Sequence, residues 1–190
     1  MQIKKTVEGI TKILDFYFSS SQMKVLGKNS LCTLLNNEDL SFAYPGKWFK
    51  DWYEFDEDYY LVEREDVLKT LIWRKDGTFV NENLWFKNWF NNFDFKNSEI
   101  ILVERENGLS TLIHKSDGTY LFKDLWFKIW FNVNKKYFQV YTTDNKTTFI
   151  KNSDGSLLFD LVPKENLRKP PFHSPNVFIC KDGNLTEFIL

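Results

Sequence analysis

Apolar side chains recur at helical spacing in the first residues of the chain. They stand four, three, four and three positions apart, with charged residues between them: Ile3, Val7, Ile10, Leu14 and Tyr17. This spacing places all of them on one face of an α-helix. Residues 1–21 are therefore predicted to form an amphipathic α-helix that ends at three serines. Because terminal repeats need a cover, the helix is expected to cap the core that follows.

From residue 25 onward the apolar and polar pattern repeats. One landmark is a Thr followed by two apolar residues, with an Asp six positions after the Thr. It occurs at Thr33, Thr70, Thr111 and Thr148, at intervals of 37, 41 and 37 residues. The segment Trp48–Tyr53 returns at residues 85–90 and 126–131 with the first two of these intervals. Landmarks that keep common intervals indicate tandem repeats with a shared core.

Within a repeat the pattern has period two and is interrupted by turn residues. Asn107-Gly108 and Asp117-Gly118 supply the positive φ that tight hairpin turns need. The first repeat has Asp39-Leu40 instead, so a different turn is expected there. The predicted fold class is mainly β, with about four tandem antiparallel hairpin or meander repeats and the N-terminal α-helix as a cap. The repeats occupy about 25–60, 61–101, 102–137 and 138–190, within a β-repeat domain of residues 22–190.

Two segments are less regular. Trp85–Phe90 puts its rings on one broad face if it is helical and on alternate sides if it is extended, and periodicity does not decide between the two. A short helical turn or a bent connection between hairpins is the preferred interpretation. Pro163–Pro175 cannot continue a regular ladder, since proline lacks an N–H donor, and is predicted to be a long surface loop.

Composition supports a well-filled β core, since 18% of the 190 residues are aromatic and such side chains favour strands. The net charge of −1 excludes a global basic field of the kind that drives non-specific nucleic-acid binding. Cys32 and Cys180 lie far apart without metal spacing, and the start of the chain lacks a secretory pattern. Reduced thiols and a cytoplasmic location are expected. No run approaches eighteen apolar residues, so no membrane span is expected.

The charges are unevenly distributed. Between Asp51 and Asp66 there are eight acidic residues and one basic residue, Arg64. Clustered carboxylates speed association with a basic surface and select partners. The candidate partner contacts are Asp51, Glu54, Asp56, Glu57 and Asp58.

The repeats resemble the WG-repeat family of bacterial β-rich tandem modules, in a degenerate form. The resemblance covers residues 25–160 and rests on Ser116-Asp117-Gly118 with its flanking strands and on the aromatic segment Leu125–Phe131. The Trp-Gly pair of the family is replaced by Ser110-Thr111 and Thr147-Thr148. The resemblance implies a non-enzymatic interaction module and carries over no catalytic residues.

No motif for catalysis, phosphate binding or metal binding occurs in the sequence. The two histidines, His114 and His173, have no neighbours at metal-ligand spacing. No cofactor, metal or enzymatic activity is therefore expected.

Three functions remain open. The leading one is a protein-binding module that engages a basic partner surface, in a sharper version a small inhibitor of a larger enzyme, such as a phage anti-defence factor. The second is nucleic-acid binding through the Trp-Phe-Lys motifs, where Lys50, Lys87 and Lys128 would contact phosphates beside stacking rings. The third is a structural component of a larger assembly, anchored by the N-terminal helix.

Overall fold

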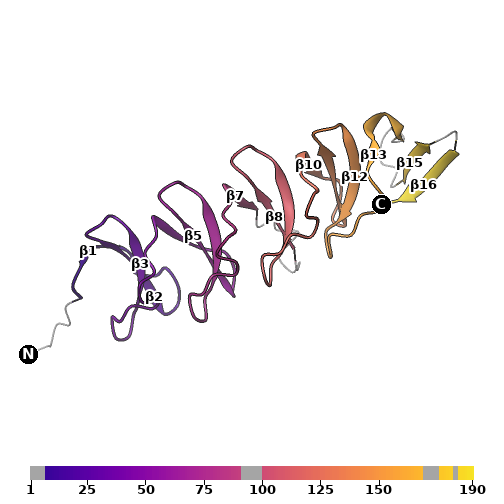
Figure 1. Cartoon of the computed structure of the whole chain (residues 1–190). Coiled ribbons are helices and arrows are strands. Elements are labelled where there is room, and N and C mark those ends of the chain that lie inside the picture. The colour runs from indigo at the N-terminus through magenta and orange to yellow at the C-terminus, as the bar shows by residue number, and fades with distance from the viewer. Residues whose placement is uncertain (1–6, 91–99, 169–175, 182–183) are drawn as a thin grey trace, which may run out of the picture. The chain divides into compact units, whose positions relative to one another are not determined.

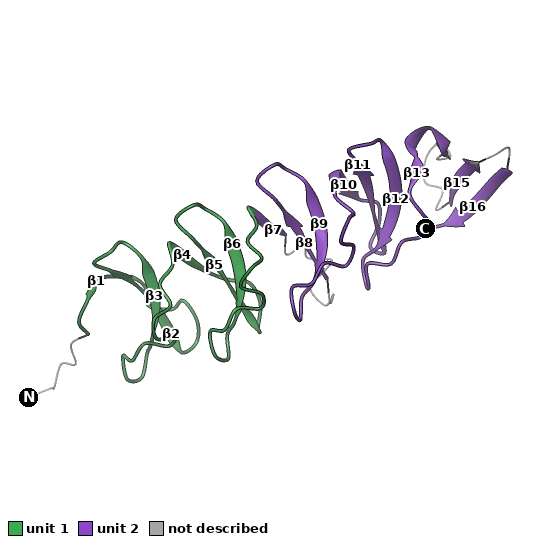
Figure 2. Cartoon of the chain, viewed as in Figure 1, with its two compact units in different colours: residues 1–87 green, residues 88–190 purple. Residues whose placement is uncertain are grey.

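A computed structural model describes residues 7–90, 100–168, 176–181 and 184–190. The chain divides into two compact units, residues 1–87 and 88–190 (Figure 2). The described residues form antiparallel strands and one short 3-10 turn, η2 (Lys164–Asn166), so the mainly β prediction is confirmed.

Unit 1 contains two three-stranded meanders (Figure 1). The first joins β1 (Ile10–Asp15), β2 (Gln22–Gly27) and β3 (Cys32–Asn36), and the second joins β4 (Asp51–Glu54), β5 (Tyr59–Glu63) and β6 (Lys69–Trp73). After β3 the chain turns back and follows that strand as a return arm, with bridges between Leu35 and Phe42 and between Cys32 and Phe49. The arm after β6 repeats these bridges, 37 residues later, at Phe79 and Phe86.

Unit 2 continues the same plan. A seven-stranded sheet contains β7 (Asn88–Phe90), β8 (Ile100–Glu104), β9 (Ser110–His114), β10 (Phe127–Asn132), β11 (Tyr137–Thr142), β12 (Lys146–Lys151) and β13 (Val162–Pro163). A separate sheet contains β14 (Leu167–Arg168), β15 (Asn176–Lys181) and β16 (Asn184–Ile189). β15 and β16 pair as an antiparallel hairpin, while Asp182 and Gly183 lie outside the described residues.

Two turns in each of the first four repeats use a residue with positive φ. The turn between the second and third strands places it at Ser30, Val67, Gly108 and Asn145. The turn into the return arm places it at Leu40, Gly77, Gly118 and Gly155. In this second turn an Asp accepts hydrogen bonds from the backbone N–H and the hydroxyl of the Ser or Thr two positions later, as Asp39 does from Ser41. The expectation of a different first turn is wrong, because Leu40 adopts the left-handed conformation of the glycines, with φ 58°.

The predicted N-terminal α-helix is absent from the described residues, and this expectation is wrong. Residues 10–15 form β1, an edge strand that pairs with β2. The pairing is irregular between Ile10 and Lys12 and again between Ile13 and Asp15. Because bulges interrupt the period of two, the apolar positions imitate helical spacing. Ile3 lies outside the described residues, while Leu14 and Tyr17 of the predicted stripe are exposed.

The Trp segments are extended rather than helical. Phe49 and Phe86 bridge back to the preceding strands, and the chain then bends at Lys50 and Lys87 before it enters β4 and β7. A bent connection therefore describes the structure, and a helical turn does not. In the proline-rich segment Pro163 ends β13, residues 164–168 form η2 and β14, and residues 169–175 lie outside the described residues.

Each unit has an aromatic and aliphatic core of its own. In unit 1 the wholly buried Trp52 stacks on Tyr44 and packs edge-on against Phe49 and Tyr60. In unit 2 the core is built around Phe127, Phe138 and aliphatic residues of β8, β9 and β12. Six of the seven tryptophans, all except Trp89, have a described ring contact, and all but Trp52 are half-buried.

Candidate partner-binding surface

The acidic segment follows β4 and the turn into β5, where the pairing of Asp51 with Glu63 and of Trp52 with Val62 fixes its register. Two of its five candidate contacts are engaged within the chain. The Asp51 carboxylate lies 3.0 Å from Lys24 Nζ, and the Glu54 carboxylate pairs with the Arg74 guanidinium. These residues are therefore less available to a partner than the sequence suggested.

The turn itself is ordered by Asp56. Its Oδ1 accepts hydrogen bonds from the backbone N–H groups of Asp58, at 2.9 Å, and of Tyr59, at 3.0 Å. Arg74 Nη1 donates to the backbone carbonyl of Asp56 over 2.7 Å, and Arg74 N donates to the Asp58 carbonyl over 2.8 Å. The turn is thus held both by its own side chain and by β6. Asp56 has a structural role, and the positions of Glu57 and Asp58 follow from it.

Glu57 and Asp58 are exposed and line a surface pocket with Trp73, Arg74 and Lys75. Neither carboxylate forms an ion pair with any residue that the structure describes. No described cation therefore pairs with either carboxylate on this ordered turn. Of the five sequence-predicted contacts, these two are exposed and have no ion pair with a described residue, whereas the exposed Glu54 pairs with Arg74.

Contacts with aromatic rings order the side chains that line this pocket. The Trp73 ring packs against Tyr59 with 4.4 Å between centroids, and Lys75 Nζ lies 4.6 Å from the Trp73 centroid. The Arg74 guanidinium lies 4.3 Å from the centroid of Tyr60. These contacts hold Trp73 and Arg74 in place, so the pocket is largely formed before any partner arrives.

Lys50, the first of the three candidate phosphate contacts, is paired within the chain. Its Nζ lies 3.0 Å from the Glu63 carboxylate, which also contacts Lys69 Nζ at 3.4 Å and the Tyr53 hydroxyl at 3.1 Å. Burial raises the pKa of Glu63, but hydrogen bonds from Lys50 and Tyr53 and the charge of Lys69 outweigh it, so the pKa is lowered. Burial, followed by the charge of Asp51, raises the pKa of Tyr53. Glu63 and the two lysines thus form a structural cluster of ion pairs.

Lys87 and Lys128 are exposed, and they belong to different compact units. The neighbouring rings of the motif, Phe49, Phe86 and Phe127, are buried in the two cores. A buried ring cannot stack on a base, so these three phenylalanines are not available for stacking.

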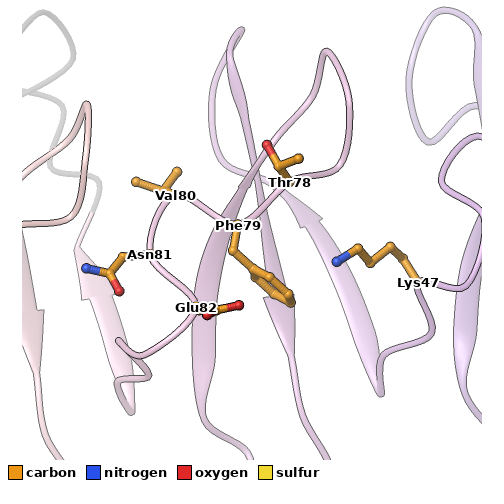
Figure 3. A pocket seen from close by; sticks show the side chains of 6 residues that line it. All are labelled: Lys47, Thr78, Phe79, Val80, Asn81 and Glu82. Atoms are coloured by element: carbon orange, nitrogen blue, oxygen red, sulfur yellow. The ribbon is translucent and has the colours of Figure 1, made fainter.

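Figure 3 shows a second pocket in unit 1, lined by Lys47, Thr78, Phe79, Val80, Asn81 and Glu82. It lies beside the return arm that follows β6. Lys47, from the preceding return arm, places its Nζ 4.1 Å from the centroid of Phe79. The lysine thus covers the face of the ring that would otherwise be available for stacking.

Sequence reasoning missed a repeated arginine–tryptophan contact. The Arg64 guanidinium lies 4.4 Å from the ring centroid of Trp85, and Arg105 lies 3.6 Å from that of Trp126. The signal was present in the sequence, since both the arginines and the tryptophans recur after 41 residues.

No group of three His, Cys, Asp or Glu side chains in the described residues could hold a metal ion. His114 ends β9, half-buried, and His173 lies outside the described residues. Among those residues no helix has the length and apolar character needed to cross a lipid bilayer.

No family model matches the sequence, and no curated protein matches it. Several solved structures are similar. The computationally designed Ika8 protein has a TM-score of 0.39 at 10% identity, over 90% of this chain and 56% of that one. The WD40 β-propeller domain of Doa1 has a TM-score of 0.33 at 10% identity, over 90% and 65%. BamB from Moraxella catarrhalis has a TM-score of 0.38 at 12% identity, over 100% and 62%. The chain spans less than two thirds of each of these proteins.

Proposed function

We propose that the chain is a non-enzymatic protein-binding module whose contact surface is centred on Glu57 and Asp58. The observation that supports this proposal is that the carboxylates of the acidic segment have different roles. Asp51 and Glu54 are neutralised by Lys24 and Arg74, and Asp56 orders the turn. Glu57 and Asp58 keep their charge at the surface, beside the pocket that contains Trp73.

The pocket combines features that suit a basic protein surface. Two carboxylates attract an Arg or Lys side chain and increase the association rate at low salt. Trp, Tyr and Arg side chains carry much of the binding energy at protein interfaces, and here Trp73 and Arg74 are already ordered. A partner that inserts one basic side chain between Glu57 and Asp58 would also bury part of Trp73.

A sharper version makes the chain a small inhibitor of a larger enzyme, such as a phage anti-defence factor. If the partner normally binds nucleic acid, its basic surface is the one that Glu57 and Asp58 fit. The carboxylates then compete with phosphates for the same side chains.

The test is affinity capture with the full chain from a lysate of the source organism, followed by mass spectrometry. We expect a basic protein to be retained by the parent chain and lost with E57Q/D58N. The control D124N/D160N removes the same charge from exposed positions in unit 2 and should retain the partner. Retention should weaken as salt is raised.

Capture that is equal for the parent chain and E57Q/D58N would overturn the proposal. Retention of nucleic acid that is lost with K87Q/K128Q would instead support the alternative function.

A further inference from the structure

Two equivalent positions of the repeat place an arginine over a tryptophan, one in each compact unit. A second ring packs against each indole, with 5.9 Å between the centroids of Phe79 and Trp85 and 5.7 Å between those of Tyr120 and Trp126. Every member of the two stacks is separated by the same 41 residues, as Arg64 is from Arg105. The two sites can therefore be compared residue by residue.

They differ in the residue that follows the arginine by two positions. In unit 1 this residue is Asp66, whose two carboxylate oxygens accept hydrogen bonds from one edge of the Arg64 guanidinium, from Nε at 3.1 Å and from Nη2. In unit 2 it is Asn107, which has no charge. Arg105 Nη2 donates to the Tyr120 hydroxyl over 3.2 Å, and Arg105 forms no ion pair with any described residue.

The change from Asp to Asn leaves the turn intact. Asp66 Oδ1 accepts a hydrogen bond from Leu68 N at 3.3 Å, and Asn107 Oδ1 accepts one from Leu109 N at 3.1 Å. Both side chains thus order the backbone in the same way. Among the described residues of unit 2, no carboxylate pairs with the arginine.

We propose that Arg105 receives a carboxylate of a protein partner, from an Asp or Glu side chain, in the manner in which Arg64 holds Asp66. A guanidinium that is stacked on an indole has already lost much of its rotamer freedom, and its planar edge matches the two oxygens of a carboxylate. The Asp66 contact shows this arrangement within the same molecule.

The surroundings of Arg105 favour a single carboxylate over a phosphate. Glu104 and Glu106 flank Arg105 in the sequence. Glu104 accepts a hydrogen bond from Asn88 at 3.4 Å, and Glu106 is exposed. Negative charges at these two positions repel the two charges concentrated on one phosphate group more strongly than the single charge of one carboxylate group. This contact belongs to unit 2, whereas the Glu57 and Asp58 surface belongs to unit 1 and has the opposite polarity.

The inference is tested by nuclear magnetic resonance with the full chain and a synthetic probe, acetyl-Asp-Asp-Asp-amide. The signals observed are the Arg105 Nε–H and the Trp126 Nε1–H. We expect the probe to shift both in a saturable way, while the matching tri-asparagine peptide does not. In N107D the new carboxylate should occupy Arg105, and the shift should be lost. In D66N the Arg64 and Trp85 signals should begin to respond.

Three results would overturn the inference: Arg105 signals that stay in place, a response in N107D equal to that of the parent chain, or a larger response to inorganic phosphate than to the peptide at equal concentration. Because the probe carries no basic group, none of these results bears on the Glu57 and Asp58 surface.

Discussion

The indole N–H of Trp52 donates a hydrogen bond to the backbone carbonyl oxygen of Cys32 over 2.9 Å. Trp52 lies in β4 and Cys32 in β3, so this bond joins the two meanders of unit 1. The Trp52 ring has 0% exposure and contacts the rings of Tyr44, Phe49 and Tyr60. One side chain thus connects two meanders whose strands belong to different sheets.

Replacing Trp52 with Phe should destabilise the protein. The variant loses the hydrogen bond and leaves a cavity among the surrounding rings, for a loss in unfolding free energy of about 2 kcal/mol. Urea unfolding of the full chain measures this loss. Trp85 is half-buried and also donates through its indole N–H, to Glu82 O, so W85F is a control that should lose less. Equal losses in W52F and W85F would contradict this account.

Val67 is strained. It is a β-branched residue with φ 63° and an exposed fraction of 48%, at the position that Gly108 occupies in unit 2. Left-handed backbone is costly for such a side chain, and little packing is lost when it is removed. V67G should therefore raise stability by about 1 kcal/mol, as measured by thermal unfolding. A lower melting temperature in V67G would show that the strain does not control stability here.

Gly77 and Gly108 show two separate reasons why a turn position requires glycine. Both have positive φ, 70° and 78°. A Cβ on Gly77 would lie 2.5 Å from Tyr44 Cδ1, whereas one on Gly108 would meet nothing within 4 Å. G108A should cost about 1 kcal/mol for backbone strain alone, and G77A about 3 kcal/mol because Tyr44 must also move. Similar costs in chemical unfolding would show that Tyr44 moves aside freely.

The stability of the protein should depend on pH through Asp154. Hydrogen bonds from the Ser156 side chain and backbone, with a further contribution from Lys151, lower the pKa of Asp154 to about 2. The ordinary pKa of an unfolded Asp is about 4. A lowered folded-state pKa stabilises the protein above about pH 4, and this stabilisation is lost as the pH falls toward 2. The melting-temperature advantage of the parent chain over D154N should shrink over that range. A constant difference would refute the coupling.

The two thiols should differ in reactivity. Cys32 is 3% exposed, and burial, followed by the charge of Asp51, raises its pKa, whereas Cys180 is exposed. A thiol reagent such as dithionitrobenzoate should therefore modify one cysteine rapidly in the folded protein and both in urea. C180S should abolish the rapid phase. Rapid modification of C180S would show that Cys32 is accessible.

Local patterns were sufficient to predict most of the fold. The strands of the repeats follow from alternation, and the turn at Gly118 follows from its Asp-Gly dipeptide, since both depend on near neighbours. The edge strand β1 could not be recognised because its two irregular pairings remove the period of two. The turn at Leu40 was not predicted, because leucine seldom adopts a left-handed backbone. Hydrogen bonds from Asn36 to Ser41 and from Ser41 to Asp39 hold the turn in that conformation.

The candidate surface was only partly predictable. The acidic composition identified Glu57 and Asp58, but the sequence does not indicate that Lys24 reaches Asp51 or that Arg74 reaches Glu54. These pairs are 27 and 20 residues apart, and the first joins two neighbouring meanders while the second joins the two ends of one meander. The difference between Asp66 and Asn107, by comparison, can be found by aligning the repeats. Its consequence for the neighbouring arginines follows only from the structure, which places each arginine on a tryptophan.

Strands in each described sheet follow the order in which they are synthesised, from β1-β2-β3 onward. Such pairings have low contact order, which favours rapid folding. A meander can form as soon as its last strand leaves the ribosome, without waiting for distant segments. Gain or loss of one whole repeat would likewise lengthen or shorten the chain without changing the order in which the remaining strands pair. The architecture therefore permits evolution by duplication.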